Sequence, residues 1–175
     1  MVWEACQTFS GSWGYHRDES TWKSEDMLVQ MLINTVSTGG NLLLNVGPTG
    51  RGEFDERALN ALDAMGRWMH HHSRSIYGCT QAPDDIPAPL DGRYTYNPQT
   101  HRLYLHLYAW PFKQIWLDGL ADRIVYAQLL NDGSEVPWHE TPADAQEQRG
   151  GTVRLMLPIV KPNVTVPVVE IILRR

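Results

Sequence analysis

Residues 39–48 read GGNLLLNVGP: a glycine pair, three leucines between two asparagines, and a Gly-Pro turn. An apolar run without polar alternation is typical of a strand that is covered on both faces, as in the parallel sheets of α/β proteins. Asn41 and Asn45 place polar groups at the two ends of this apolar segment. The run therefore predicts a parallel-sheet strand over residues 41–46.

Helical patterns lie on both sides of this strand. Ser24 is suited to cap a first helix that ends at Gly39, and Asp55 is suited to cap a second helix that runs to about residue 72. Apolar residues recur at helical spacing in both segments. The predicted buried positions are Leu28, Met31, Leu32, Thr35 and Val36 in the first helix, and Leu59, Leu62, Met65, Trp68 and Met69 in the second. One β/α repeat cannot bury both faces of its strand, so we expect neighbouring strands that this sequence does not supply.

The pattern changes after residues 79–89, where three prolines and an acidic pair predict a boundary between a segment 1–83 and a segment 88–175. Beyond the boundary, short alternating runs separated by turns replace the helical period. Residues 94–96 and 103–108 flank a predicted hairpin turn, and further strands are predicted at 115–117, 124–127, 153–157 and 168–173. The second segment therefore predicts a small antiparallel β-sandwich. The predicted fold class is α/β followed by all-β.

Bulk properties exclude several classes of function. A net charge of −5 and a pI near 5.8 argue against a nucleic-acid partner, because phosphate binding needs a basic surface. No run of 18 or more apolar residues is available to span a membrane. Cys6 and Cys79 favour two unpaired thiols over a disulfide. Residues 70–72 are three consecutive histidines, whose side chains on a helix point about 100° apart, so no metal site is predicted there.

Five residues near the amino terminus and the strand are candidates for chemistry. Trp3 and Glu4 stand beside small residues, and Glu4 is either a general acid or sugar ligand, or a charge on an exposed strand end. Trp13 lies in a Gly/Ser loop and offers a flat apolar face to a sugar, or else anchors the loop. Asn45 stands at the carboxyl end of the predicted strand, where active-site residues of barrels gather, or else binds the following turn. Cys6 is a nucleophile or a small buried residue. Together these residues predict sugar chemistry at the rim of a barrel.

The order and spacing of several motifs resemble the α-L-fucosidases of glycoside hydrolase family 29. The resemblance is specific over residues 3–83 and continues in less detail over 90–175. It rests on Trp3-Glu4-x-Cys6, Ser12-Trp13-Gly14-Tyr15, the run at 39–48, Gly52-Glu53, Trp68 and Ile76-Tyr77-Gly78.

The resemblance implies the last part of a (β/α)8-like catalytic barrel followed by a β-sandwich domain. It implies retaining hydrolysis of terminal α-L-fucosyl linkages, in which one carboxyl group forms a glycosyl intermediate and another acts as acid and then base. It implies no metal and no organic cofactor. The expected partner is a fucosylated glycan substrate, and neither nucleic acid nor a membrane is expected to bind. The chain is also expected to associate with a further copy of itself or with a missing amino-terminal half.

The resemblance also assigns roles to residues. In the family, the nucleophile, the usual acid/base carboxylate and the histidines that bind fucose precede the Trp3-Glu4 motif, so we expect this chain alone to be inactive. Trp13 matches an aromatic residue that lines the pocket for the fucose methyl group. Cys6 matches a signature position, and Glu4 is its neighbour. The catalytic candidates are therefore Glu4 and Cys6, and the substrate-binding candidates are Trp3, Trp13 and Asn45.

Two other classes of function stay open. One is a non-catalytic carbohydrate-binding or interaction module whose working part is the sandwich, with Trp110, Trp116 and Trp138 as its aromatic platform. The other is a pseudoenzyme that associates with an intact relative. The cell compartment also stays open, because residues 1–4 lack a signal-peptide pattern but the true amino terminus is expected to lie upstream.

Overall fold

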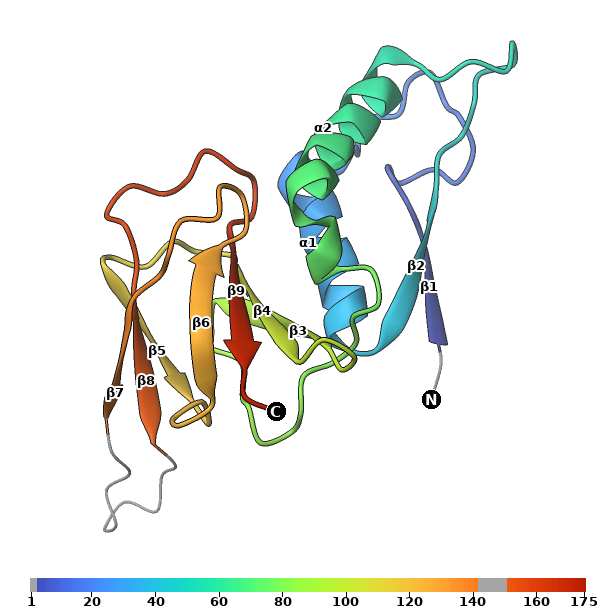
Figure 1. The fold of residues 1–175 in the computed structure, drawn as a ribbon. Coiled ribbons are helices and arrows are strands. Elements are labelled where there is room, and N and C mark those ends of the chain that lie inside the picture. The colour runs from blue at the N-terminus through green and yellow to red at the C-terminus, as the bar shows by residue number, and fades with distance from the viewer. Residues whose placement is uncertain (1–2, 142–150) are drawn as a thin grey trace.

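The computed structural model describes residues 3–141 and 151–175. Residues 1–2, the first half of the segment 1–4 that lacks a signal-peptide pattern, lie outside the described residues. Figure 1 shows the described elements in layers: a pair of strands, two helices, and two further sheets. The elements are β1 (Trp3–Thr8), α1 (Glu25–Ser37), β2 (Gly40–Asn45), α2 (Glu56–His72), a 3-10 turn (Ser73–Ser75), β3 (Gly92–Asn97), β4 (Arg102–Leu107), β5 (Gln114–Asp118), β6 (Ile124–Leu129), β7 (Trp138–Thr141), β8 (Thr152–Met156) and β9 (Val168–Leu173).

The first part of the chain is a β-α-β unit followed by a second helix. β1 and β2 are parallel and in register from Trp3 opposite Gly40 to Thr8 opposite Asn45. The predicted cap at the start of α1 is confirmed, because the Ser24 side chain accepts the backbone N–H of Met27. Gly39, with a φ of +80°, ends this helix as predicted. The cap of α2 is confirmed as well: Asp55 accepts the backbone N–H of Ala58.

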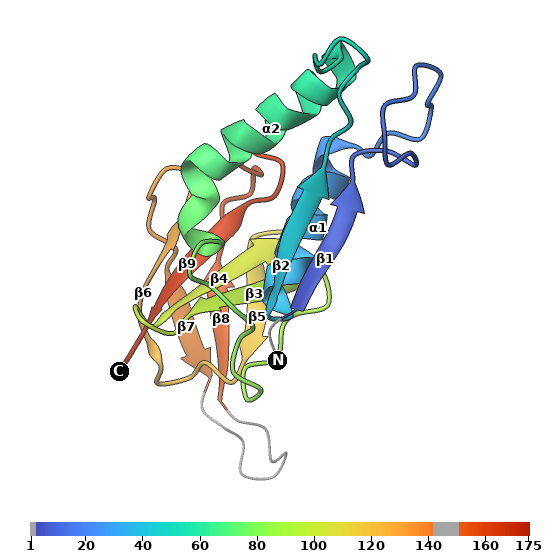
Figure 2. The ribbon, with the colours of Figure 1, turned by 90° about the vertical axis from the view of Figure 1, so that its right-hand side faces the viewer.

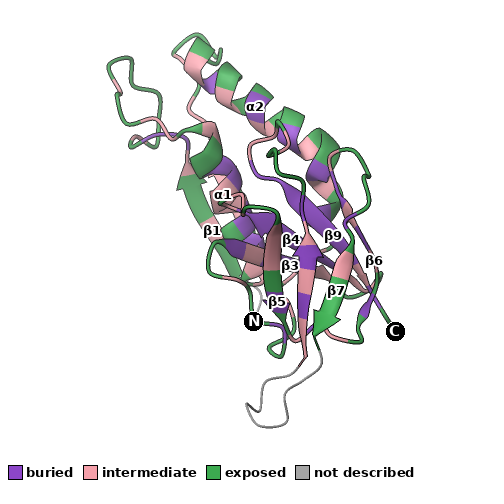
Figure 3. Ribbon diagram, turned by 90° about the vertical axis from the view of Figure 1, so that its left-hand side faces the viewer, coloured by how far each residue is buried: buried purple, intermediate pink, exposed green. Residues whose placement is uncertain are grey.

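One face of the two-stranded sheet is open. Ala5 of β1 lines a groove with Met31 of α1, so alternate residues of both strands face the helix. The other set faces away from it and includes Leu43, which is 50% exposed. That set consists of Glu4, Cys6, Thr8, Asn41, Leu43 and Asn45. Within this chain the strand is therefore covered on one side only, and Figure 3 shows β1 as mostly exposed.

The buried faces of the helices differ in part from the predicted ones. In α1, Met31 and Leu32 are only partly buried, whereas Val29 and Ile33 are fully buried. The single-face prediction missed these two because α1 is packed on two sides, against β2 and against the antiparallel part of the chain. Predicted buried positions Leu28, Thr35 and Val36 are confirmed.

Helix α2 is rotated relative to the prediction. Leu59 is 52% exposed and Leu62 is 37% exposed, so their predicted burial is wrong, whereas the burial of Trp68 is confirmed. The buried stripe consists of Ala58, Ala64, Trp68 and His72. Small alanines allow the helix to lie close to its neighbours, and this rotation turns the larger leucines toward solvent.

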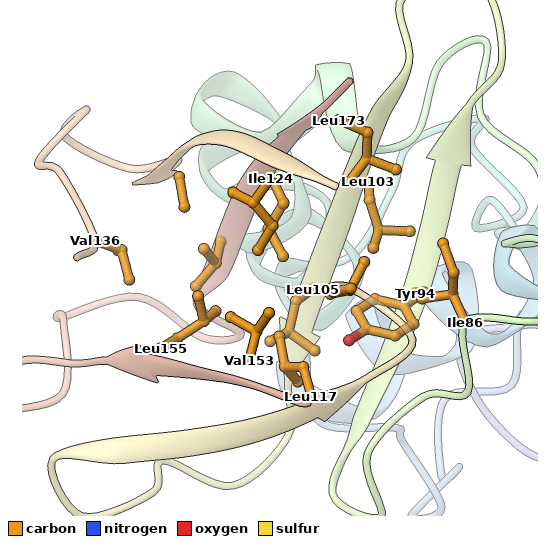
Figure 4. Close-up of a cluster of buried hydrophobic side chains, with 14 of the residues drawn as sticks. Ile86, Tyr94, Leu103, Leu105, Leu117, Ile124, Val136, Val153, Leu155 and Leu173 are labelled. Carbon is orange, nitrogen blue, oxygen red and sulfur yellow. The ribbon is translucent and has the colours of Figure 1, made fainter. Parts of the chain in front are cut away.

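The second part of the chain consists of two antiparallel sheets that face each other. One sheet has the strand order β3-β4-β9-β6 and the other β5-β8-β7. The predicted hairpin over 94–108 is confirmed as the β3–β4 pair, whereas β7 was not predicted. Figure 4 shows Leu105 of β4 and Val153 and Leu155 of β8 in the cluster of apolar side chains between the sheets.

A second apolar cluster joins the helices to the four-stranded sheet. Ile33 and Trp68 pack there with Tyr104 and Val168, and the Trp68 indole N–H donates to the carbonyl of Val166 at 2.9 Å. β9, at the centre of this contact, is buried along almost its whole length (Figure 3). The helices and the antiparallel sheets therefore share a core. Among the described residues, no helix is long and apolar enough to cross a membrane.

Candidate active site

The candidate site lies at the carboxyl ends of β1 and β2. Figure 2 shows the loop after β1 and the loop after β2 leaving the same end of the sheet. They span residues 9–24 and 46–55. In α/β enzymes with parallel strands, this is the end at which substrate is bound.

Polar side chains at the strand ends hold the first loop in place. The Asn45 side-chain amide donates from Nδ2 to the carbonyl of Trp13 at 2.5 Å. Thr8, beside Asn45 on the other strand, donates from Oγ1 to the carbonyl of Ser12 at 3.1 Å. Lys23 donates from Nζ to the carbonyl of Thr8 at 2.6 Å, which closes the base of the loop. The backbone around Trp13 is thus bound to both strands.

The second loop packs directly against the first. A Cβ placed on Gly47 would lie 2.4 Å from the backbone nitrogen of Tyr15 and 2.7 Å from the carbonyl carbon of Gly14. Only a residue without a side chain allows this contact. Glycine at position 47 therefore sets how closely the two loops approach.

Arg57 is a positioning residue that the sequence analysis missed. Its guanidinium pairs with Asp55, which caps α2, through Nε at 3.0 Å and Nη2 at 2.6 Å. It also donates from Nη1 to the carbonyl of Glu19 at 2.8 Å, and it lies 4.8 Å from the centroid of the Trp22 ring. The available signal was the spacing Asp-x-Arg at the start of a helix, which occurs too often at helix termini to indicate a loop anchor.

The loop presents aromatic surface to solvent. Trp13 is 57% exposed and Tyr15 is also exposed, although their backbones are fixed by the contacts with Asn45 and Gly47. A rigid backbone with an open indole face suits the apolar face of a sugar ring or a methyl group. Trp13 and Asn45 are therefore brought together as one unit, with Asn45 acting through the loop.

Glu4 and Cys6 lie on the open face of the sheet, away from the loop. Glu4 stands opposite Asn41 near the amino end of the sheet, and Cys6 stands opposite Leu43 in the middle. The Cys6 thiol is 4.0 Å from the Glu4 carboxylate, and both residues are accessible. They share a face with Thr8 and Asn45 but do not touch the loop that carries Trp13.

Trp3 lies at the opposite end of the sheet from Trp13. Its indole N–H donates to the carbonyl of Thr38 at 3.1 Å, and its ring covers Gly40 so closely that a Cβ there would lie 2.4 Å from it. These contacts fix the end of α1 to the start of β1. The structure does not bring Trp3 to the other two substrate-binding candidates.

Of the three consecutive histidines only His72 is buried, and of the two thiols only that of Cys79 is partly buried. The His72 ring is buried, stacks on Trp68 with centroids 4.9 Å apart, and places Nδ1 2.8 Å from the Trp68 carbonyl. Within residues 3–141 and 151–175, no group of three or more His, Cys, Asp or Glu side chains is arranged to hold a metal ion. Cys6 and Cys79 are free thiols, and burial raises the pKa of Cys79 to about 11.

The fold defines a β-α-β unit of the α/β class, with the candidate loops at the carboxyl ends of its parallel strands, joined to antiparallel sheets. The family model for alpha-L-fucosidase matches residues 1–74. The chain is 34% identical over 144 residues to plasma alpha-L-fucosidase of Pongo abelii, and this match covers 78% of this chain and 31% of the relative. It is 42% identical over 150 residues to tissue alpha-L-fucosidase of Bos taurus, covering 81% of this chain and 31% of the relative.

Solved structures agree with these relatives. Alpha-L-fucosidase isoenzyme 1 from Paenibacillus thiaminolyticus superposes with a TM-score of 0.87 at 36% identity, covering 100% of this chain and 40% of that one. The enzyme from Vibrio sp. strain EJY3 gives a TM-score of 0.89 at 26% identity, covering 99% and 30%. The chain belongs to the α-L-fucosidase family of glycosidases. It spans 31% of the length of these curated relatives.

Proposed function

We propose that this chain is the carboxy-terminal portion of a retaining α-L-fucosidase that hydrolyses terminal α-L-fucosyl linkages in glycans. Residues 1–83 form the last part of its (β/α)8-like barrel, and residues 88–175 form a β-sandwich domain. β1 and β2 are two neighbouring strands of the barrel sheet. Their open face is the barrel interior, and the loops at their carboxyl ends form part of the rim around the fucose.

The observation that carries this proposal is the open face of the β1–β2 sheet. Leu43 is half exposed at its centre, flanked by polar side chains on both strands. Burying a leucine stabilises a protein by about 1.5–3 kcal/mol, so an isolated sheet forgoes that contribution. A mixed polar and apolar face of this kind suits the inside of a barrel, where further strands cover the leucine and substrate meets the polar groups.

The residues then take distinct roles. Trp13 packs its exposed face against the fucose methyl group, and Asn45 holds the Trp13 backbone in place. Glu4 and Cys6 line the interior wall of the barrel on the amino-terminal side of the fucose site, with Glu4 near the amino end of β1 and Cys6 in the middle of the strand. The nucleophile and the acid/base carboxylate, which retaining glycosidases place about 5–5.5 Å apart, come from the rest of the barrel. Residues 1–175 by themselves therefore have no fucosidase activity.

A chimera tests the proposal directly. Residues 1–175 replace the matching 40% of the Paenibacillus thiaminolyticus enzyme, and hydrolysis of an aryl α-L-fucoside is measured. We expect turnover by the chimera and none by the 175-residue chain. Trp13→Ala should lower kcat/KM of the chimera about ten- to hundredfold, because it removes a large apolar contact. Tyr77→Ala, at another exposed aromatic residue, is the matched control and should leave kcat/KM unchanged.

Turnover by the pure 175-residue chain would contradict the proposal that the nucleophile and the acid/base carboxylate come from the rest of the barrel. A chimera that is folded by circular dichroism yet inactive would contradict the enzyme assignment. In that case, co-purification of the chain with an intact fucosidase would favour a pseudoenzyme, and binding of fucosylated glycan without turnover would favour a binding module.

A further inference from the structure

The outer face of the β5-β8-β7 sheet carries a row of three side chains that the proposed active site does not use. This sheet lies on the far side of the molecule from α1 and α2 (Figure 1). Trp116 of β5 is opposite Arg154 of β8, and Arg154 is in turn opposite His139 of β7. Leu117 and Leu155, the next residues on β5 and β8, are buried in the core between the sheets. Strand alternation therefore turns the row of three to the outer surface.

Trp116 offers an open aromatic surface. It is 49% exposed, and the guanidinium carbon of Arg154 lies 5.5 Å from its ring centroid. The other two tryptophans predicted as a platform do not join it: Trp110 and Trp138 pack against the core, and the Trp110 indole N–H donates to the carbonyl of Pro158. The platform prediction is thus reduced to one tryptophan with a cation beside it.

Arg154 has unused binding capacity. No carboxylate among the described residues lies within ion-pair distance of it, in contrast to Arg102 and Arg123, which are paired. His139 is exposed next to Arg154 on the edge strand. The row therefore places positive charge beside an apolar ring on a chain whose net charge is −5.

We propose that Trp116, Arg154 and His139 form a second saccharide site that binds an anionic polysaccharide. The apolar face of one sugar ring packs on Trp116. A sulfate or carboxylate group on the same chain accepts hydrogen bonds from the guanidinium of Arg154, whose planar array of N–H groups matches such anions. His139 adds a further ring N–H at the edge of the row. The site holds a polymer on the face remote from the proposed fucose site, and the binding does not depend on hydrolysis.

The test uses the 175-residue chain with dextran sulfate as the anionic probe and dextran as the neutral one. Native gel electrophoresis through each polymer gives the dissociation constant from the retardation of the protein. We expect retardation by dextran sulfate and little by dextran. Trp116→Ala and Arg154→Ala should each weaken binding to dextran sulfate about tenfold. Arg154→Lys keeps the charge but loses the planar array, so it should also bind more weakly than the parent.

Two variants at exposed positions elsewhere serve as matched controls. Tyr77→Ala removes an exposed aromatic ring and Arg67→Ala an exposed cation, and both should bind like the parent. Circular dichroism of each variant confirms that the fold is kept. Trp116→Ala removes no charge, so unchanged binding of that variant, when folded, would reduce the effect to general attraction for a polyanion and overturn the proposal. Absence of dextran sulfate binding by the parent, or equal binding of dextran, would overturn it as well.

Discussion

The side-chain amide of Asn45 donates to the backbone carbonyl of Trp13 at 2.5 Å, joining two residues that are 32 positions apart. Asn45 is the last residue of β2, and Trp13 lies in the loop after β1. The strand end thereby determines where the exposed indole stands. A polar residue at the carboxyl end of a strand thus positions a loop residue of the candidate site by binding its backbone carbonyl.

We expect Asn45→Asp to disturb this arrangement. A carboxylate cannot donate a hydrogen bond to the Trp13 carbonyl and repels it. The loop therefore loses this hydrogen bond, and the Trp13 carbonyl is left without its donor. In the chimera with the Paenibacillus thiaminolyticus enzyme, kcat/KM for an aryl α-L-fucoside should fall about tenfold or more. Asn163→Asp, at an exposed position outside the β1–β2 sheet, is the control and should stay close to the parent. Equal activity of the two variants would show that activity does not depend on the hydrogen bond from Asn45 to the Trp13 carbonyl.

The contact between the two loops makes a second prediction. A Cβ on Gly47 would collide with the backbone at Tyr15, whereas a Cβ on Gly50 meets nothing within 4 Å. Gly47→Ala should therefore lower the free energy of unfolding by about 1–3 kcal/mol, because backbone must move to admit the methyl group. Gly50→Ala should be neutral or slightly stabilising. Urea unfolding of both variants measures the difference, and similar midpoints would show that the loops do not depend on this contact.

Local signals in the sequence predicted much of the first part of the fold. Ser24 and Asp55 cap helices where expected, because capping depends on a side chain and the backbone three residues on. The faces of the helices were harder to predict. Leu59 and Leu62 read as the inner stripe of α2, yet the helix packs through alanines and Trp68. Which stripe is buried depends on the neighbouring elements, and helical spacing does not contain that information.

The candidate site divides in the same way. Asn45 became a candidate because its position at a strand end is visible in the sequence. Arg57 was not found, since its role arises from carbonyl groups of a loop about 40 residues away, at Glu19 and Arg17. Trp3 and Trp13 are the same type of residue and were both substrate-binding candidates, but they stand at opposite ends of one sheet. Contacts between distant segments therefore decide the roles that residue type leaves open.

The buried carboxylate of Glu170 supplies a prediction for the contact between the helical part and the antiparallel sheets. Glu170 is fully buried on β9, where it accepts from Arg102 at 2.8 Å and Gln128 at 2.5 Å and pairs with Arg74 at 3.2 Å. Glu170→Gln should lower the free energy of unfolding by about 1–3 kcal/mol, since it removes the charge that both guanidinium groups face. Asp63→Asn, which breaks an exposed pair with Arg67, should cost about 0–1 kcal/mol. If urea unfolding finds equal losses of free energy for the two variants, the buried ion pairs of Glu170 contribute no more to stability than the exposed pair of Asp63 and Arg67.

Two buried histidines predict how stability depends on pH. Burial lowers the pKa of His106 to about 3, and the charge of His72 acts in the same direction. Burial also lowers the pKa of His72, where the charge of His71 acts in the same direction and the hydrogen bond to the Trp68 carbonyl opposes it. Both rings are fully enclosed around Trp68, and Thr95 lies 2.9 Å from Nε2 of His106. The folded protein therefore holds both rings neutral at a pH where the unfolded chain has protonated them.

The sign follows from the lowered pKa values. Above the ordinary histidine pKa of about 6.5, the stabilising contribution is complete, and it is lost as the pH falls from there toward 3. His106 contributes a slope of about 1.4 kcal/mol per pH unit in that window, and His72 adds to it in the same direction. His106→Gln keeps a hydrogen-bonding group for Thr95 but cannot titrate, so its free energy of unfolding should fall less steeply between pH 6.5 and pH 4. His70→Gln, at an exposed position on α2, is the matched substitution outside the buried pair. Parallel curves for His106→Gln and the parent would show that the acid sensitivity of this protein comes from its carboxylates instead.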